Sequence, residues 1–294
     1  MAAPAPATRW AGLLCLAATA VGWGLNWPAM KLLLQEWPPL SARGAAGVVA
    51  AAILAGVALG RGESLGVPRG AWPRLLLAAF TNVFAWMGCS TVAMTWVSVS
   101  EGALLVYTMP LWATVLAWPL LGTRPSSRGF VALLLGFAGV AVLLSARGID
   151  FDTGKILGIV LALTAAVCFA LGTLLNRAPL PVPPIALVAW QVGLGCLPML
   201  LLGLVFEHPA LGALSGVGWA VLVYMTLVPM GACYLTWFAT LRRLPPATAS
   251  TGMLLVPLVG VVSAAAMLGE ALGPREALAI VLTLGGVALA LRKA

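Results

Sequence analysis

The chain of 294 residues is 62% hydrophobic and only 8% charged, and its mean hydropathy is +1.06. A soluble domain carries about 25% charged residues, so this composition excludes a soluble fold and predicts a polytopic helical membrane protein. The net charge of +8 comes from basic residues scattered between apolar runs, which indicates membrane topology rather than nucleic-acid binding. The apolar runs are continuous rather than alternating, so a transmembrane β-barrel is also excluded.

An Ala/Pro-rich leader, residues 1–9, opens the chain, and we expect it to be disordered. A signal peptide is the competing interpretation of the run that follows. The apolar core of a signal peptide is about 7–15 residues long, whereas this run extends from Trp10 to about Leu34. It also has a counterpart at Gly158-Ile159-Val160 in the second half. We therefore interpret it as the first membrane span.

Each span needs about 20 apolar residues. On this basis the sequence predicts an all-α protein with ten spans, near residues 10–32, 40–60, 74–95, 102–121, 129–146, 155–176, 184–206, 218–240, 247–268 and 275–292. Five spans fall in each half. We expect the first repeat to cover residues 10–146 and the second to cover 147–294.

The two halves resemble each other in sequence. A shift of 147 residues places Pro110 on Pro257 and Arg128 on Arg275, and 13 of the 35 positions from 110 to 144 are then identical without a gap. Chance would give about four matches in a chain of this composition, so the search for repeats indicates a duplicated unit.

The charges predict an orientation for the ten spans. With a cytoplasmic N-terminus, eleven basic residues lie on the inner side and four on the outer side, with Arg43 near the outer end of the second span. This positive-inside bias places both termini in the cytoplasm. Because each repeat has an odd number of spans, the second copy must enter the membrane from the opposite side. Inverted repeats are typical of secondary transporters, whose substrate site lies between the halves.

The repeated pattern of Pro-Leu, Leu-Gly, Arg and Gly-Val resembles the EamA-repeat family of the drug/metabolite transporter superfamily. Trp23-Gly24-Leu25-Asn26, the two prolines Pro110 and Pro257, and Gly269-Glu270 carry this resemblance. The first half departs from it at Gly122-Thr123, where the family usually has Gly-Glu. Within the family the chain looks most like a bacterial exporter of aromatic and other neutral amino acids. The resemblance implies export across the inner membrane, with a central cavity lined mainly by spans 1, 3, 4, 6, 8 and 9.

Ionisable groups within a span are functional candidates, but the predicted spans hold almost none. Arg43 and Glu101 lie close to span ends, where long side chains can reach the membrane surface. Small multidrug exporters of the superfamily use a glutamate in their first span, where this chain has Trp23 and Asn26. We therefore expect a cavity without fixed charge, suited to a neutral or zwitterionic, partly apolar substrate.

Uncharged polar and aromatic groups are the better candidates for substrate contacts. Several share one helix face because they are three or four residues apart. The candidates are Trp23, Asn26, Trp86, Ser90, Tyr107, Gln191, Tyr234 and Trp237. Hydrogen bonding between helices, worth about 0.6 kcal/mol on average, is the alternative role for each of them.

Pro110 and Pro257 each remove a backbone hydrogen bond, so we expect both to kink their spans and to act as hinges. The five cysteines lie in apolar runs without metal-ligand spacing, which favours buried small side chains.

We expect no enzymatic activity, no cofactor, no metal and no nucleic-acid partner. The expected partners are a small-molecule substrate and the lipid bilayer. We expect a monomer, although Gly56 and Gly60 could pack within one chain or between two. Two other functions stay open at this point, a broader drug or metabolite exporter and a non-transporting membrane receptor or assembly protein.

Overall fold

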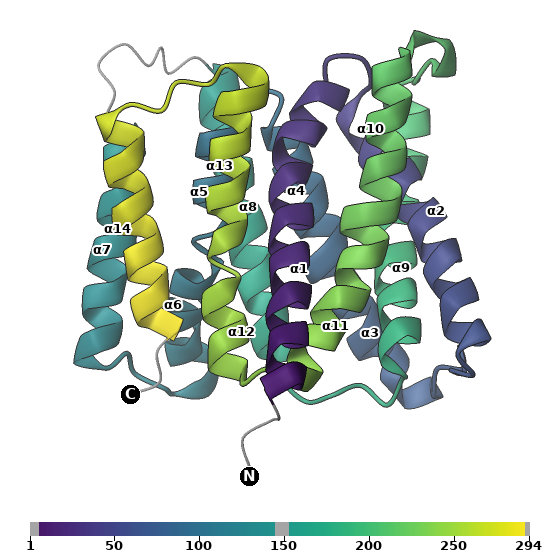
Figure 1. Cartoon of the computed structure of the whole chain (residues 1–294), viewed down its shortest axis with the longest axis horizontal. Helices are drawn as coiled ribbons and strands as arrows, with labels where there is room; N and C mark the ends of the chain where they lie inside the picture. The colour runs from purple at the N-terminus through teal and green to yellow at the C-terminus, as the bar shows by residue number, and fades with distance from the viewer. Residues whose placement is uncertain (1–5, 145–152, 292–294) are drawn as a thin grey trace.

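The computed structural model describes residues 6–144 and 153–291, and these residues form ten helices long and apolar enough to cross a membrane (Figure 1). The ten predicted spans are thereby confirmed, with boundaries that differ by a few residues. The first helix, α1 (Pro6–Leu33), begins earlier than expected, so residues 6–9 of the predicted disordered leader are helical. Both chain ends lie at one end of the bundle (Figure 1), which we call the terminal end; the opposite end is the distal end.

Six spans are single helices: α1, α2 (Pro39–Gly60), α7 (Ser127–Leu144), α8 (Thr153–Leu175), α9 (Pro184–Phe206) and α14 (Pro274–Leu291). The other four spans, the third, fourth, eighth and ninth, consist of several segments. The third contains η1 (Arg69–Ala71), α3 (Trp72–Ala79), η2 (Phe80–Ala85) and α4 (Trp86–Ala93), and the fourth contains α5 (Val99–Val106) and α6 (Met109–Leu121). The eighth, which follows the short helix η3 (Leu211–Ala213), contains α10 (Gly216–Leu227), η4 (Val228–Ala232) and α11 (Cys233–Arg243), and the ninth contains α12 (Pro246–Gly252) and α13 (Leu255–Leu268).

The segmented spans occupy equivalent places in the two repeats. Both η2 and η4 are π-helical turns, and they lie about 147 residues apart. Gly122 and Gly269, exactly one repeat apart, both end a helix with a positive φ, at 68° and 69°. A side chain is strained in this left-handed conformation, which is why glycine ends both helices. The duplication predicted from the sequence is therefore present in the backbone.

The two predicted kinks are helix breaks. The fourth span stops being α-helical at Tyr107 and Thr108, and Pro110 is the second residue of the new helix α6. In the ninth span α12 ends at Gly252, and Pro257 is the third residue of α13. Proline is tolerated in the first turn of a helix because the N–H groups there have no intrahelical partner.

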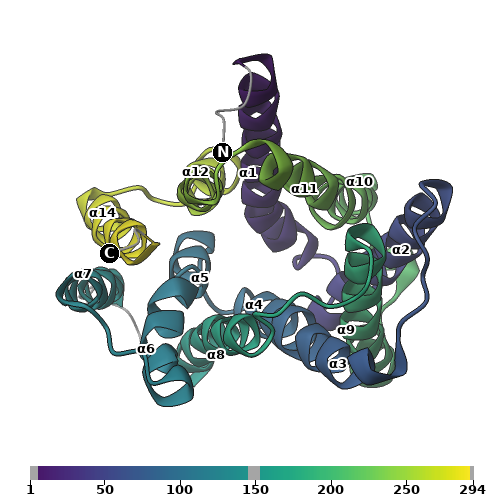
Figure 2. The ribbon, with the colours of Figure 1, turned by 90° about the horizontal axis from the view of Figure 1, so that it is seen from below.

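Two pairs of equivalent helices pack closely across the repeats, α2 against α9 and α7 against α14 (Figure 2). Glycines allow this approach. A Cβ atom at Gly47 would lie 2.1 Å from the Cys196 sulfur, and one at Gly286 would lie 2.6 Å from the Ala132 carbonyl oxygen. Small residues at such contacts are typical of membrane helix pairs. A Cβ at Gly56 or Gly60 would meet no described atom within 4 Å, so these glycines do not pack within the chain.

Carboxylates from loops cap the first turns of helices in the other repeat. Glu207 accepts hydrogen bonds from the backbone N–H groups of Leu40 and Ser41 in α2, at 3.0 and 2.8 Å. In the equivalent exchange, Glu63 accepts hydrogen bonds from the first turn of α9. A carboxylate there satisfies unpaired N–H groups and interacts favourably with the helix dipole.

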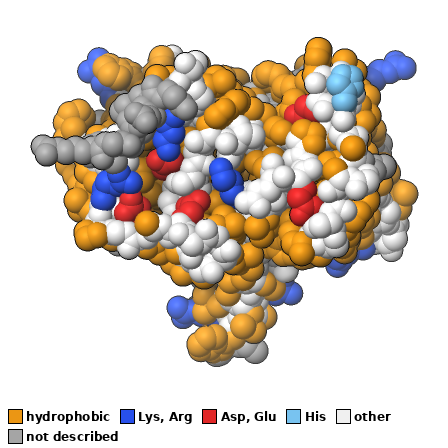
Figure 3. Space-filling model, turned by 90° about the horizontal axis from the view of Figure 1, so that it is seen from above, with side chains coloured by type: hydrophobic (Ala, Val, Ile, Leu, Met, Phe, Trp, Pro, Cys, Tyr) orange, Lys and Arg blue, Asp and Glu red, His pale blue; other side chains and the backbone are white. Residues whose placement is uncertain are grey.

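Two further caps lie at the distal end, where Figure 3 shows carboxylates at the surface. Glu270 caps α5 and Glu36 accepts hydrogen bonds from Ser215 at the start of α10. At the terminal end, the residue equivalent to Glu270 is Thr123, and α12 begins without a side-chain cap. Among the described residues, three carboxylates (Glu36, Glu207 and Glu270) thus bind helix starts of the other repeat at the distal end and one (Glu63) does so at the terminal end.

Candidate functional site

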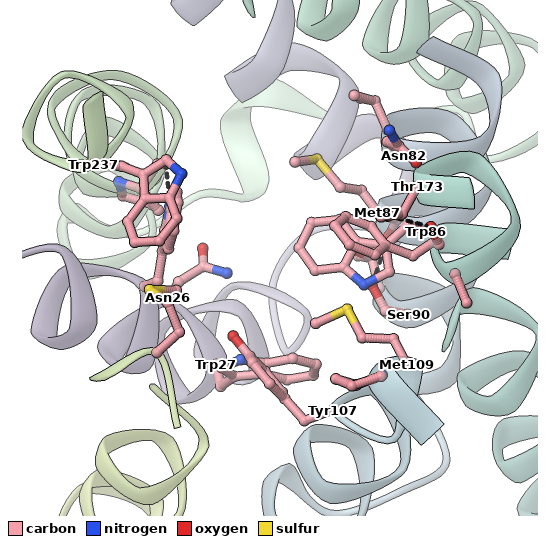
Figure 4. Close-up of a pocket in the computed structure, with 18 of the residues that line it drawn as sticks. Asn26, Trp27, Asn82, Trp86, Met87, Ser90, Tyr107, Met109, Thr173 and Trp237 are labelled. Atoms are coloured by element: carbon pink, nitrogen blue, oxygen red, sulfur yellow. Dashed lines mark hydrogen bonds between the residues drawn. The ribbon is translucent and has the colours of Figure 1, made fainter. Parts of the chain in front are cut away.

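A cavity of about 540 Å³ lies between the two repeats (Figure 4). Its lining extends from Met94 near the distal end to Leu291, the last residue of α14, at the terminal end. All eight sequence candidates line it, namely Trp23, Asn26, Trp86, Ser90, Tyr107, Gln191, Tyr234 and Trp237. Pro110 also lines the cavity, whereas Pro257 is buried in helix packing outside it.

The lining comes from more spans than expected. Spans 1, 3, 4, 6, 8 and 9 supply most of it, as the family resemblance implied, but α2, α9 and α14 add Arg43, Gln191, Val287 and Leu291. Both π-helical turns reach the cavity, through Asn82 and Val83 from η2 and through Pro229 and Met230 from η4. Such turns are frequent at functional sites because they shift a helix register locally.

Aromatic rings form two walls of the cavity. On one side the Trp23 ring packs edge-on against Tyr234, with centroids 5.5 Å apart, and lies 6.2 Å from Trp237. On the other side Trp86 packs against Phe169 at 5.3 Å. Trp27 and Tyr107 lie together at 6.2 Å, below the open space in Figure 4. Faces and edges of such rings bind apolar and aromatic groups.

Some of the polar candidates already have partners within the protein. The Trp23 indole donates to the Pro229 carbonyl oxygen at 2.8 Å, and the Ser90 hydroxyl donates to the Met87 carbonyl at 3.1 Å. The Pro229 carbonyl belongs to the π-helical turn η4. Trp23 therefore links α1 to the second repeat, and its N–H is not available to a ligand.

Two other candidates have buried polar atoms without a partner. Within the described part of the chain, neither the Asn26 amide oxygen nor the Trp86 indole nitrogen has a hydrogen-bond partner. These residues lie on opposite sides of the cavity, one on α1 and one on α4 (Figure 4). A buried polar atom without a partner is costly and calls for an explanation. One acceptor and one donor, on residues of the two walls, are therefore left without a partner in the described part of the protein.

The expectation of a cavity without fixed charge is wrong. Arg43 does not extend to the membrane surface; its side chain is buried, with 6% of the residue exposed, and it lines the cavity. Its Nε donates to the Thr91 hydroxyl at 3.1 Å. Arg43 lies one turn inside α2, next to the glycines that pack against α9. The direction of its side chain is therefore decided by helix packing and not by its distance from the end of the span.

Glu101 is also buried, contrary to the sequence interpretation, with 6% exposed. It forms a capping box with Ser98 at the start of α5 and an ion pair with Lys155 from the second repeat. Nearby, the Lys31 ammonium donates to the carbonyl oxygens of Met94 and Val97. These contacts tie α1, α4, α5 and α8 together at the distal end and lie outside the main cavity.

Several lining residues were missed by sequence reasoning. Asn82 and Thr173 add polar groups, and Phe169 adds an aromatic ring. Asn82 carried a usable signal, because an amide in the middle of an apolar span needs a partner. Among the described residues no group of three or more His, Cys, Asp or Glu side chains could hold a metal ion.

The model of the EamA-like transporter family matches residues 10–145 and 156–292, one match in each repeat. The chain belongs to this family. A solved crystal structure shares the fold, with a TM-score of 0.67 over 97% of this chain and 96% of that one at 23% identity. The fold, ten membrane helices in two inverted EamA repeats around a central cavity, is thereby established.

Three similar proteins are named as a transporter or an efflux pump. The uncharacterized transporter YvbV of Bacillus subtilis is 29% identical over 91% of this chain and 86% of its own length. A probable amino-acid metabolite efflux pump of Salmonella typhimurium is 28% identical over 94% of this chain and 93% of its own. The uncharacterized inner membrane transporter YedA of Escherichia coli is 28% identical over 88% of this chain and 83% of its own.

Proposed function

We propose that this protein exports small neutral metabolites, in particular aromatic and other neutral amino acids, across the bacterial inner membrane by alternating access. The observation that carries the proposal is the cavity between the repeats, whose lining contains indole and phenol rings together with Asn26 and Trp86, each of which has an unpaired polar atom. Ligand sites are typically apolar cavities with a few placed polar groups. The name of the Salmonella relative supports amino acids as the substrate class.

The proposal includes an orientation and a moving part. With both termini in the cytoplasm, the distal end faces outward and is closed by Glu270 and Lys31, while the cavity lining reaches the cytoplasmic end at Leu291. The repeats, residues 10–146 and 147–294, act as the two inverted units. The segmented spans rock at the breaks before Pro110 and Pro257 and expose the cavity alternately to either side.

Purified protein in liposomes tests the substrate class. We expect saturable flux of aromatic and other neutral amino acids, and no flux of nucleotide sugars, because the walls are aromatic and the cavity holds about 540 Å³. Each compound is measured with and without a pH gradient, which also decides whether protons are coupled. Flux of cationic dyes without amino acids would favour the broader drug exporter. A protein-free liposome is the control, and no flux of any compound would favour a non-transporting role.

Variants at Trp86 and Trp23 distinguish a substrate contact from a structural hydrogen bond. Trp86→Phe removes an N–H without a partner, so we expect the thermal midpoint to hold while amino-acid flux falls about tenfold, as for a lost hydrogen bond of about 1.4 kcal/mol. Trp23→Phe removes the bond to Pro229, so we expect it to cost about 1 kcal/mol of stability. Thermal denaturation and flux are measured on both variants. Full flux in Trp86→Phe removes Trp86 from the substrate site.

A further inference from the structure

Arg43 is a buried cation whose hydrogen-bonding capacity is largely unused. A guanidinium has five N–H donors. The protein gives Arg43 one hydroxyl acceptor, Thr91 Oγ1 at 3.1 Å from Nε, and one weak contact, from Nη2 to the Met30 sulfur at 3.9 Å. A charge removed from water is stable only when a partner compensates it. The remaining donors of Arg43 therefore need an acceptor that the cavity supplies.

No described carboxylate is that partner. Six of the eight acidic residues are described, and each is engaged elsewhere, in a helix cap or an ion pair: Glu36, Glu63, Glu101, Glu207, Glu270 and Glu276. Glu207 contacts α2, the helix that carries Arg43, but its oxygens accept hydrogen bonds from Leu40 and Ser41. Within residues 6–144 and 153–291 the ion pairs are Lys155–Glu101 and Arg275–Glu276.

The charged, polar and aromatic residues of the cavity lining indicate what kind of ligand would complement Arg43. Among the residues that the structure describes, the lining contains one cation, Arg43, and no Asp or Glu. Asn26 and Trp86 belong to the same lining, and each has one buried polar atom without a partner, an acceptor in Asn26 and a donor in Trp86. Aromatic rings form part of the remaining wall, and the faces of such rings attract an ammonium group.

We propose that Arg43 binds the carboxylate of the transported substrate and makes the cavity selective for zwitterionic α-amino acids with an apolar side chain. This inference rests on the proposed function and deepens it. Guanidinium groups bind carboxylates through two parallel N–H donors, which fixes the orientation of the ligand. Asn26 accepts a hydrogen bond from the substrate ammonium, Trp86 donates to a carboxylate oxygen, and the substrate side chain lies among the rings. Thr91 holds the guanidinium in place by accepting the hydrogen bond from Nε.

The test compares two ligands that differ at one group. Flux of phenylalanine and of phenylalaninamide is measured in liposomes containing the full-length protein. We expect the wild-type protein to prefer the acid at least tenfold. In Arg43→Gln the efficiency for the acid falls about 10- to 100-fold, the range for a charged hydrogen bond, while flux of the amide is unchanged. Arg61→Gln is the matched control, because Arg61 ends the same helix at an exposed position; it keeps the wild-type preference.

Further variants keep the test decisive if Arg43→Gln does not fold. Arg43→Lys retains the positive charge but loses the two parallel N–H donors of the guanidinium. Thr91→Val retains the guanidinium but removes the hydroxyl that accepts from Nε. We expect both variants to raise KM for phenylalanine and to leave transport of the amide unaffected. Equal handling of acid and amide by the wild-type protein overturns the inference and leaves amino-acid export standing. An unaltered preference in all Arg43 variants also overturns it. Absence of flux for every amino acid in the wild-type protein overturns the proposed function instead.

Discussion

Replacing Gly286 by valine is expected to force α7 and α14 apart and to destabilise the protein by about 1–3 kcal/mol, as overpacking does. The reason is a contact with backbone. A Cβ at Gly286 would lie 2.6 Å from both the Ala132 carbonyl oxygen and the Gly136 nitrogen. Backbone atoms cannot rotate aside as side chains do, so the helices themselves must move.

The neighbouring residue provides the control for this prediction. A Cβ at Gly285 would meet nothing within 4 Å, so Gly285→Val introduces the same side chain on the open face of the same helix. Thermal midpoints of both variants are measured in detergent, together with their gel-filtration profiles. Equal midpoints for the two variants would show that the α7–α14 contact does not carry this stability.

Replacing Glu270 by alanine is expected to open the distal end of the cavity. The carboxylate accepts hydrogen bonds from the Val99 and Ser100 backbone N–H groups at 2.6 and 3.1 Å and from the Ser100 hydroxyl at 3.0 Å. Hydrogen bonds to a charged group contribute about 1.5–3 kcal/mol each. We therefore expect the loss of all three to raise the population of a conformer in which α5 and α13 are separated, by a factor of at least about ten.

Thiol labelling measures this shift. Met94 lines the cavity near the distal end and is 1% exposed, so Met94→Cys in a cysteine-free background reports opening. In the proposed orientation, with the distal end outside, a membrane-impermeant reagent added outside the cell should label it at least tenfold faster when Glu270 is alanine. Glu276→Ala is the control, because Glu276 pairs with Arg275 and Gly273 within its own repeat. Identical labelling rates with and without Glu270 would exclude it as an outer closure.

The repeat could be predicted from the sequence because duplication leaves a constant offset. The 147-residue shift that aligned Pro110 with Pro257 also separates Gly122 from Gly269, and it holds to within one residue for the two π-helical turns. The turns themselves were not predicted. Hydrophobic periodicity does not distinguish one extra residue in a helical turn, and η2 contains no proline to indicate it.

The residue types at the cavity were predictable, but their hydrogen-bonding state was not. Trp23 and Trp86 are equal candidates in sequence, yet one indole donates to a carbonyl and the other has no partner. Arg43 shows the same limit. Its short distance from the span end predicts a charge at the membrane surface. The direction of its side chain, however, depends on Thr91 in a different span and on the glycine contacts with α9. Such partners are set by tertiary packing, which the local pattern does not contain.

The exchange of helix caps between the repeats has a consequence for how the chain is made. The carboxylates that cap α2 and α5 are Glu207 and Glu270, which follow their partners by 166 and 171 residues. During synthesis these first-repeat helices enter the membrane before their caps exist. Membrane helices insert singly and associate afterwards, so the first repeat is completed only when the second has been made. The two repeats are copies in structure but form a single unit of assembly.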